Sequence, residues 1–187
     1  MRLFVALPLS PGLREIVTQT QDALRSRIAA RDVKWVTPAN IHLTLHFLGE
    51  TAPAQKEKLI AALAAACSGI PPLNLQTGAL GSFPDARRPR VIYWGLQGDL
   101  ETLADLQARV SSAVAPFGAH QETKPFTPHL TLGRVKSFDK RTLQAIGNAI
   151  EYCPVSTTDW LVQNIELISS ELTPQGPIYS VVSRVAL

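Results

Sequence analysis

The stretch NIHLTLHF, residues 40–47, alternates apolar and polar side chains, and its tetrapeptide HLTL returns at residues 129–132. Alternation with a period of two is typical of a β-strand that buries one face. Residues two apart in a strand share a face, so His42 and Thr44 point one way while the leucines point the other. The same argument applies to His129 and Thr131. Each stretch therefore predicts a strand that presents an imidazole beside a hydroxyl.

The surroundings of the two HLTL stretches correspond at a constant offset. The histidines are 87 residues apart, and the same offset carries Leu13 to Leu100 and Leu59 to Ile146. Around each HLTL stretch the pattern predicts a strand and a helix before it and a helix after it. The expected strands are 2–9 and 90–96, and the expected helices are 10–30, 51–66, 99–110 and 137–150. This agreement predicts an internal duplication, with pseudo-repeats at about 1–70 and 88–155.

Two further strands are expected at 156–169 and 179–186, where they complete the sheets. The predicted fold class is α+β. We expect a single two-lobed domain over residues 1–187, in which two antiparallel β-sheets, each flanked by helices, enclose a cleft. If the lobes pack with pseudo-twofold symmetry, the two His–Thr pairs face each other across that cleft.

Composition excludes several classes of protein. Of the 187 residues 45% are hydrophobic, so the chain can build a packed core. Lys and Arg number 18 against 15 Asp and Glu, and this net charge of +3 permits an anionic ligand without requiring one. Two cysteines are too few for a disulfide framework or a four-cysteine zinc site. No apolar run reaches the roughly 18 residues of a membrane span, and the expected location is cytoplasmic.

Two opposed imidazoles suit displacement at phosphorus. A base must deprotonate the attacking oxygen while an acid protonates the leaving oxygen on the far side. Histidine can take either part near neutral pH because its ordinary pKa is about 6.5. The hydroxyls of Thr44 and Thr131 can donate hydrogen bonds to the non-bridging phosphate oxygens. This chemistry requires neither a metal nor a cofactor, and we predict none.

The quoted motifs resemble the two-histidine (2H) phosphoesterase superfamily, which is defined by two HxTx motifs in duplicated lobes. The match looks closest to the bacterial and archaeal RNA 2′,3′-cyclic phosphodiesterases, historically called 2′-5′ RNA ligases. The resemblance extends along the whole chain: MRLFVALPL at 1–9, WVTPANIHLTLHFLGE at 35–50, GSFP at 81–84, RPRVIYWG at 88–95 and KPFTPHLTLGRV at 124–135.

The resemblance implies hydrolysis of RNA 2′,3′-cyclic phosphate termini to a 2′-phosphate, together with reversible joining of 2′-5′ linkages. It makes His42 the proton donor to the leaving oxygen and His129 the base that activates water. It also implies an RNA or oligonucleotide partner. From the lack of a long apolar run we expect no membrane association, and we expect a monomer. Arg134 completes HLTLGR as in the family and is a candidate phosphate ligand. Strict strand parity puts Arg134 on the leucine face, so it reaches the phosphate only if a bulge at Gly133 turns it round.

Weaker candidates for lining the substrate are His46, Phe83 and Arg90. His46 follows Thr44 on the same strand face, and Phe83, in a Gly-Ser-Phe-Pro loop, can stack on a base. Arg90 belongs with Arg87 and Arg88 to a dense basic cluster that can steer RNA phosphates. Each also has a structural interpretation: His46 as a solvated rim residue, Phe83 as a packing residue under its loop, and Arg90 as part of a solvated loop. His120 and Lys124 are noted only because they precede the second motif.

Three alternatives remain open at this point. The four-residue spacing of His42 and His46 suits zinc on a helix, but on a strand it separates the two side chains by about 13 Å. A phosphodiesterase acting on another cyclic phosphate or on a 2′-5′ oligonucleotide would use the same histidines. A non-catalytic RNA-binding module would keep the cleft without needing both imidazoles. Turnover of a 2′,3′-cyclic phosphate in excess chelator distinguishes these cases.

Overall fold

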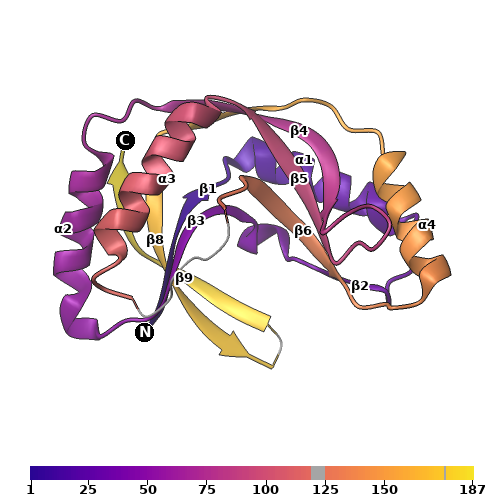
Figure 1. Ribbon diagram of the computed structural model, residues 1–187, viewed down its shortest axis with the longest axis horizontal. Helices are drawn as coiled ribbons and strands as arrows, with labels where there is room; N and C mark the ends of the chain where they lie inside the picture. Colours follow the sequence, from indigo (N-terminus) through magenta and orange to yellow (C-terminus); the bar gives the residue numbers. More distant parts are fainter. Residues whose placement is uncertain (119–124, 175) are drawn as a thin grey trace.

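The computed structural model of the protein describes residues 1–118, 125–174 and 176–187 (Figure 1). The strands are β1 (Arg2–Pro8), β2 (Val33–Trp35), β3 (His42–Glu50), β4 (Leu73–Phe83), β5 (Val91–Gly98), β6 (His129–Val135), β7 (Asp159–Val162), β8 (Asn164–Thr173) and β9 (Gly176–Ala186). The helices are α1 (Pro11–Arg25), α2 (Lys56–Cys67), α3 (Leu100–Val114) and α4 (Lys140–Glu151), with short 3₁₀ turns at η1 (Pro38–Asn40) and η2 (Pro53–Gln55).

The strands form two antiparallel sheets. The first has the order β3-β1-β8-β9, and the second has the order β2-β6-β5-β4-β7. The run β3-β1-β8 in one sheet corresponds to β6-β5-β4 in the other, and each HLTL strand lies beside the first strand of its own half. Helices α2 and α3 pack against each other beside the first sheet, and α4 packs against β4 of the second (Figure 1). The predicted α+β fold with two antiparallel sheets is confirmed.

Side-chain caps satisfy free N–H groups at the starts of helices α1 and α4. Ser10 caps α1 by accepting from the Leu13 N–H at 3.2 Å, and Pro11 occupies the first helical position. Asp139 caps α4 by accepting from the Thr142 N–H at 2.9 Å. Four ends differ from the prediction by three residues or more. Helix α1 ends at Arg25 rather than near residue 30, and α2 starts at Lys56 because η2 precedes it. Helix α3 continues to Val114 rather than 110, and α4 starts at Lys140 rather than 137.

The C-terminal strands and β4 also differ from the prediction. The expected strand 156–169 divides at Gln163 into β7 and β8, which join different sheets. Strand β4 was not expected, and Phe83 is its last residue rather than part of a loop. The hairpin of β8 and β9 is long, and its turn end extends away from the first sheet (Figure 1). The Asn40 side chain, just before β3, donates to the carbonyl of Pro177 in that hairpin at 3.0 Å.

Matching β-bulges interrupt the two HLTL strands. In β6 the pairing with β5 skips Leu132, because Tyr93 pairs with Thr131 and Ile92 pairs with Gly133. In β3 the pairing with β1 skips Leu45 in the same way. A bulge puts one extra residue in a strand and reverses which face the following side chains occupy. Leu45 and Leu132 are equivalent at the 87-residue offset, so both strands change face at the same place.

Gln21 of α1 supports the bulge in β6. Its fully buried side-chain amide donates to the carbonyls of Leu132 and Val36, each at 2.8 Å. The Leu132 carbonyl also accepts from the Val36 N–H at 2.9 Å. Buried backbone carbonyls require hydrogen-bond partners, so these contacts fix the irregular segment that leads to Arg134.

None of the helices within the described residues is long and apolar enough to cross a membrane.

Candidate active site

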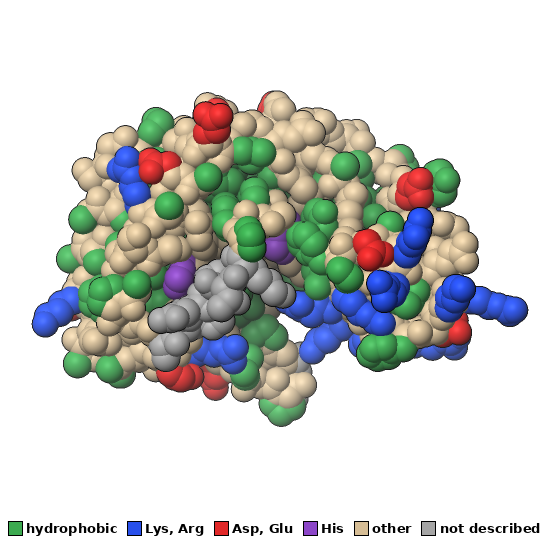
Figure 2. All heavy atoms as spheres, in the orientation of Figure 1, with side chains coloured by type: hydrophobic (Ala, Val, Ile, Leu, Met, Phe, Trp, Pro, Cys, Tyr) green, Lys and Arg blue, Asp and Glu red, His purple; other side chains and the backbone are tan. Residues whose placement is uncertain are grey.

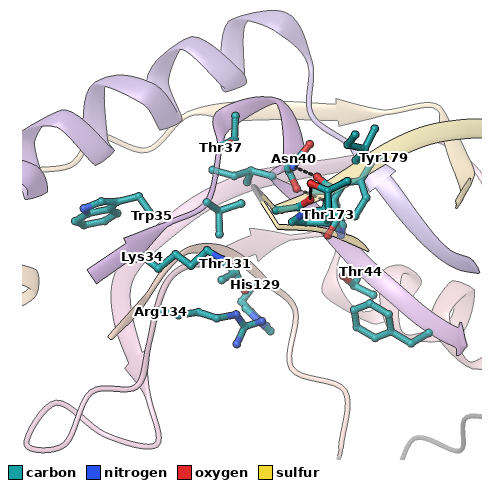
Figure 3. A pocket seen from close by; sticks show the side chains of 17 residues that line it. Lys34, Trp35, Thr37, Asn40, Thr44, His129, Thr131, Arg134, Thr173 and Tyr179 are labelled. Carbon is teal, nitrogen blue, oxygen red and sulfur yellow. Dashed lines mark hydrogen bonds between the residues drawn. The ribbon is translucent and has the colours of Figure 1, made fainter. Parts of the chain in front are cut away.

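A cleft of about 730 Å³ lies where the two HLTL strands and the β8–β9 hairpin meet. Both sheets and the hairpin contribute side chains to it (Figure 3). No Asp or Glu is among its described lining residues, which are Lys34, Trp35, Val36, Thr37, Asn40, Ile41, His42, Thr44, Phe47, His129, Thr131, Arg134, Thr173, Gly176, Pro177, Ile178 and Tyr179. The four residues predicted from the HxTx motifs are therefore brought into one cavity, and that cavity favours an anion.

The two histidines are held in the same way. His42 Nδ1 lies 2.8 Å from the carbonyl oxygen of Asn40, and His129 Nδ1 lies 2.7 Å from that of Thr127. A carbonyl only accepts, so Nδ1 carries the hydrogen in both rings. Nε2 is then the nitrogen left to exchange a proton with a ligand. Both imidazoles are thus oriented for acid–base chemistry by their own backbone, two residues before them.

Aromatic rings pack against each imidazole. His42 stacks on Phe4, with ring centroids 4.8 Å apart, and meets Tyr179 edge-on at 5.6 Å. His129 meets Phe83 at 5.0 Å and Tyr93 at 5.6 Å, both edge-on. These contacts limit rotation of the imidazole rings, so the geometry of the pair is set before a ligand arrives.

Glycine makes room for the rings beside His129. Phe83 and Tyr93 stack with centroids 4.2 Å apart, and Tyr93 pairs with Gly81 across β4 and β5. A Cβ at position 81 would lie 2.6 Å from the Tyr93 ring. Any larger residue at Gly81 would therefore displace the Tyr93 ring, which packs against His129.

Burial lowers the pKa of His42 from 6.5 to about 4, although the hydrogen bond to the Asn40 carbonyl opposes the shift. His42 is therefore neutral at pH 7 in the free protein. Burial also raises the pKa of Tyr179, against the opposing effect of Arg134 and Arg2. An anionic ligand in the cleft would favour the protonated form of His42, because opposite charges stabilise each other at short range.

Arg134 lines the cleft, and the bulge that this position requires is present in β6. The skipped pairing at Leu132 leaves both Leu132 and Gly133 buried and turns Arg134 to the face of His129 and Thr131. Figure 3 shows Arg134 beside His129, with Thr131 and Lys34 close by.

The matching bulge in β3 corrects the prediction for His46. His46 is only 7% exposed and lies on the face opposite His42, where its Nδ1 is 2.9 Å from the hydroxyl of Ser111 in α3. It does not line the cleft, and it cannot share a ligand with His42. Phe47 takes the cleft face instead.

Phe83 and Arg90 do not line the cleft either. Phe83 packs against the His129 ring, so its role is to support that candidate catalytic residue and not to stack on a nucleobase. Arg90 is half-buried; its Nη1 donates to the Ser137 carbonyl at 2.6 Å, and its guanidinium lies over the Phe138 ring. His120 and Lys124 lie outside the described residues. Within the described parts of the chain, no three His, Cys, Asp or Glu side chains are grouped closely enough to hold a metal ion.

Sequence reasoning missed Phe47, Lys34, Trp35 and Tyr179, which all line the cleft. One signal was available for Phe47, because the 87-residue offset carries it to Arg134. The equivalent position is thus aromatic in the first lobe and cationic in the second. Trp35 is only half-buried, in contrast to the buried Trp94 and Trp160.

The sequence matches the family described as LigT like Phosphoesterase over residues 7–93 and 96–179. The chain belongs to this family. The LigT-like phosphoesterase match spans both HxTx strands and most of the hairpin that closes the cleft. The resemblance to the two-histidine phosphoesterases, and the expectation of an enzyme, are thereby confirmed.

Two relatives of this LigT-like phosphoesterase are similar over nearly their whole length. A protein named RNA 2′,3′-cyclic phosphodiesterase from Aquifex aeolicus is 35% identical over 185 residues, which is 98% of this chain and 96% of the relative. One of the same name from Methanothermobacter thermautotrophicus is 35% identical over 182 residues, 96% of this chain and 95% of the relative.

Solved structures share the fold. The protein TT0787 of Thermus thermophilus superposes with a TM-score of 0.75 at 28% identity, covering 100% of this chain and 98% of that one. Escherichia coli LigT in complex with 3′-AMP also gives a TM-score of 0.75, at 24% identity, with 100% and 97% coverage. At that identity the likeness to LigT concerns the fold alone.

Proposed function

We propose that this LigT-like phosphoesterase hydrolyses RNA 2′,3′-cyclic phosphate termini and leaves a 2′-phosphate. The supporting observation is the pair of imidazoles that reach one cleft, each with Nδ1 bonded to a backbone carbonyl and Nε2 left for a ligand. The names of the Aquifex and Methanothermobacter relatives support the choice of substrate. The cyclic phosphate carries one negative charge, which suits a cleft with Lys34 and Arg134 and no described carboxylate.

In the proposed reaction His129 Nε2 accepts a proton from water as the water oxygen bonds to phosphorus. The bond between phosphorus and the 3′ oxygen breaks, and His42 Nε2 donates a proton to that oxygen. The products are a 2′-phosphate and a 3′-hydroxyl. Thr44, Thr131 and Arg134 hold the non-bridging oxygens, whose charge grows in the transition state.

His42 needs a proton before it can donate one. Its pKa of about 4 means that the free protein at pH 7 holds it neutral. The bound phosphate anion raises this pKa, so protonation of His42 accompanies substrate binding. The burial that lowers the pKa also leaves a protonated His42 poorly solvated, which favours transfer of its proton to the leaving oxygen.

The same arrangement supports joining of 2′-5′ linkages. If the 5′-hydroxyl of a second RNA takes the place of water, His129 accepts its proton and the 3′ oxygen leaves as before. The product is then a 2′-5′ phosphodiester. Ligation therefore needs no catalytic group beyond those proposed for hydrolysis.

The proposal is tested by incubating the protein in excess EDTA with an RNA that ends in a 2′,3′-cyclic phosphate. We expect a 2′-phosphate product, identified by its resistance to an enzyme that removes only 3′-phosphates and by mass. A 3′-phosphate would contradict the proposed leaving oxygen while keeping the two-histidine chemistry. No turnover would direct attention to another phosphodiester or to a binding role.

Thr44→Ala and Thr131→Ala are each expected to lower kcat/KM by about tenfold to a hundredfold, since each removes a hydrogen bond to a charged oxygen. Thr44→Ser and Thr131→Ser keep the hydroxyl and provide the matched controls, which should stay within a few-fold of the wild type. Steady-state kinetics on a nucleoside 2′,3′-cyclic phosphate measure the effect. Equal rates for the Ala and Ser variants would remove that threonine from the phosphate site.

A further inference from the structure

Two cations stand directly opposite each other at one end of the cleft. Lys34 of β2 pairs with Arg134 of β6 in the antiparallel ladder, and both are exposed and line the cleft. Directly paired residues share a sheet face, and like charges in such a pair destabilise a sheet. None of the ion pairs within the described residues involves either side chain. A ligand with spaced negative charges would relieve this repulsion.

The positive face continues beyond the cleft. After Arg134, Val135 is buried, and Lys136, which follows the last residue of β6, is exposed like Arg134. The Lys136 N–H donates to the Asp32 carbonyl at 2.7 Å, which holds this segment beside the start of β2. Cations thus follow one another outward from the catalytic candidates.

An exposed aromatic ring ends this row of cations. Phe138 is 81% exposed, although burying an aromatic ring of its size would stabilise the protein. It is held in place from beneath, because the Arg90 guanidinium lies 4.1 Å from its ring centroid and donates to the Ser137 carbonyl. The outer face of the ring is therefore available for stacking. We call Lys34, Arg134, Lys136 and Phe138 the basic track.

The charge of the whole chain is distributed unevenly around this track. Residues 31–36, 85–90 and 134–141 contain nine Lys and Arg and three Asp and Glu, a net charge of +6. The rest of the chain contains nine basic and twelve acidic residues, a net charge of −3. These segments are joined by the pairing of β2 with β6 and of β5 with β6. Figure 2 shows Lys and Arg side chains gathered on the side where β2, the end of β6 and α4 meet in Figure 1.

We propose that the basic track binds the RNA strand on the 5′ side of its terminal cyclic phosphate, so that the substrate is a chain of several nucleotides rather than a mononucleotide. This inference rests on the proposed function, because it takes the cyclic phosphate to lie between the histidines. Lys34 and Lys136 contact successive backbone phosphates, and Phe138 stacks on an unpaired base.

The dimensions and chemistry of the track fit single-stranded RNA. From Thr131 to Lys136 an extended chain advances by roughly 15 Å, which leaves room for nucleotides beyond the one that is cleaved. Proteins bind single strands by combining cations that follow the backbone with aromatic side chains on which bases stack, without reading sequence. The track offers both, and we expect little base preference along it.

The test compares two substrates and two double variants. The substrates are a nucleoside 2′,3′-cyclic phosphate and a ten-nucleotide single-stranded RNA with the same end. Lys136→Ala with Phe138→Ala removes the outer track, and both positions lie outside the cleft. Lys58→Ala with Tyr152→Ala removes an exposed lysine and an exposed aromatic residue elsewhere, as the matched control.

For the track variant we expect kcat/KM on the ten-nucleotide RNA to fall at least tenfold, while kcat/KM on the mononucleotide stays within twofold. The control variant should stay within twofold on both substrates. An equal fall on both substrates, or no fall on either, would overturn the proposal.

Binding provides a readout that does not depend on turnover. Fluorescence anisotropy with a labelled ten-nucleotide RNA ending in a 2′-phosphate gives Kd as a function of salt. Lys136→Ala should lower the slope of log K against log salt by about 0.7, the value for one phosphate contact with a single strand. Phe138→Ala should weaken binding without changing the slope. If Kd and slope are unchanged in both variants, the proposal that the basic track binds RNA is wrong, even if the enzyme is active. If both variants change binding as expected but the protein shows no turnover, only the proposed reaction is contradicted.

Discussion

His42→Ala and His129→Ala are each expected to lower kcat on a 2′,3′-cyclic phosphate by about 10²–10⁴-fold, the usual contribution of a positioned acid or base. The double variant should lose much less than the product of the two single losses. When one histidine is absent, proton transfer at the other end of the reaction no longer proceeds in concert, so the remaining imidazole has little left to contribute. Single-turnover rates at saturating substrate measure all three variants.

Folding must be separated from chemistry in this experiment. The hydrogen-bond partners of both imidazoles are backbone carbonyls of the preceding residues, so the substitutions leave no buried side chain unpaired. His42→Gln and His129→Gln keep a polar side chain at each position and should be as inactive as the alanine variants. Losses that multiply in the double variant would show that the two histidines act in independent steps.

The HxTx strands and their exposed faces were predictable because alternation is a local property. His42 and Thr44 are two residues apart in β3, as are His129 and Thr131 in β6, so a period of two assigns their faces directly. The helices followed from caps and apolar spacing for the same reason. The expected helices over 10–30 and 137–150 are found as α1 and α4, although α4 begins after its cap Asp139 rather than at residue 137.

The residues that lie past the bulges could not be assigned in this way. A bulge depends on how a strand pairs with its neighbour, and the alternation of NIHLTLHF continues unbroken through Leu45. Strict alternation puts His46 on the face of His42 and position 47 on the face of the leucines, whereas the structure buries His46 and turns Phe47 to the cleft. At Arg134 the predicted family role conflicted with parity, and that conflict was the only local sign of a bulge.

Local sequence patterns also could not predict which residues of distant elements line the cleft. Tyr179 reaches His42 because β8 pairs with β1 and carries β9 with it, and no local pattern specifies that order. Trp35 lines the cleft because β2 is the edge strand of the second sheet. We infer that the chain is one two-lobed domain that arose by duplication, since the 87-residue offset relates the bulges as well as the motifs.

The stability of the free protein is expected to depend on His42 as the pH falls. The pKa of His42 is about 4 in the folded protein and about 6.5 in an unfolded chain. Between these values the unfolded chain binds a proton that the folded protein does not, so the free energy of unfolding decreases as the pH falls from about 6.5 to 4. The full difference corresponds to at most about 3 kcal/mol.

His42→Phe removes the titration while keeping an aromatic ring against Phe4 and Tyr179. Urea unfolding at intervals from pH 7 to pH 4 should show the wild type losing up to about 3 kcal/mol more than this variant, because every other group titrates in both. Tyr179→Phe keeps His42 in its packed site and should follow the wild type. Parallel curves for the wild type and His42→Phe would mean that His42 is not desolvated in the folded protein.

A nucleoside 2′-phosphate should reverse this effect if it binds between the histidines. Its anion raises the folded-state pKa of His42 toward the unfolded value. We therefore expect the ligand to increase the free energy of unfolding of the wild type more at pH 5 than at pH 7, and we expect this difference to be larger than the one measured for His42→Phe. The free-energy cost of protonating the buried His42 is thus offset by the bound phosphate. Ligand-dependent stabilisation that is the same in both proteins at both pH values would place the phosphate away from His42.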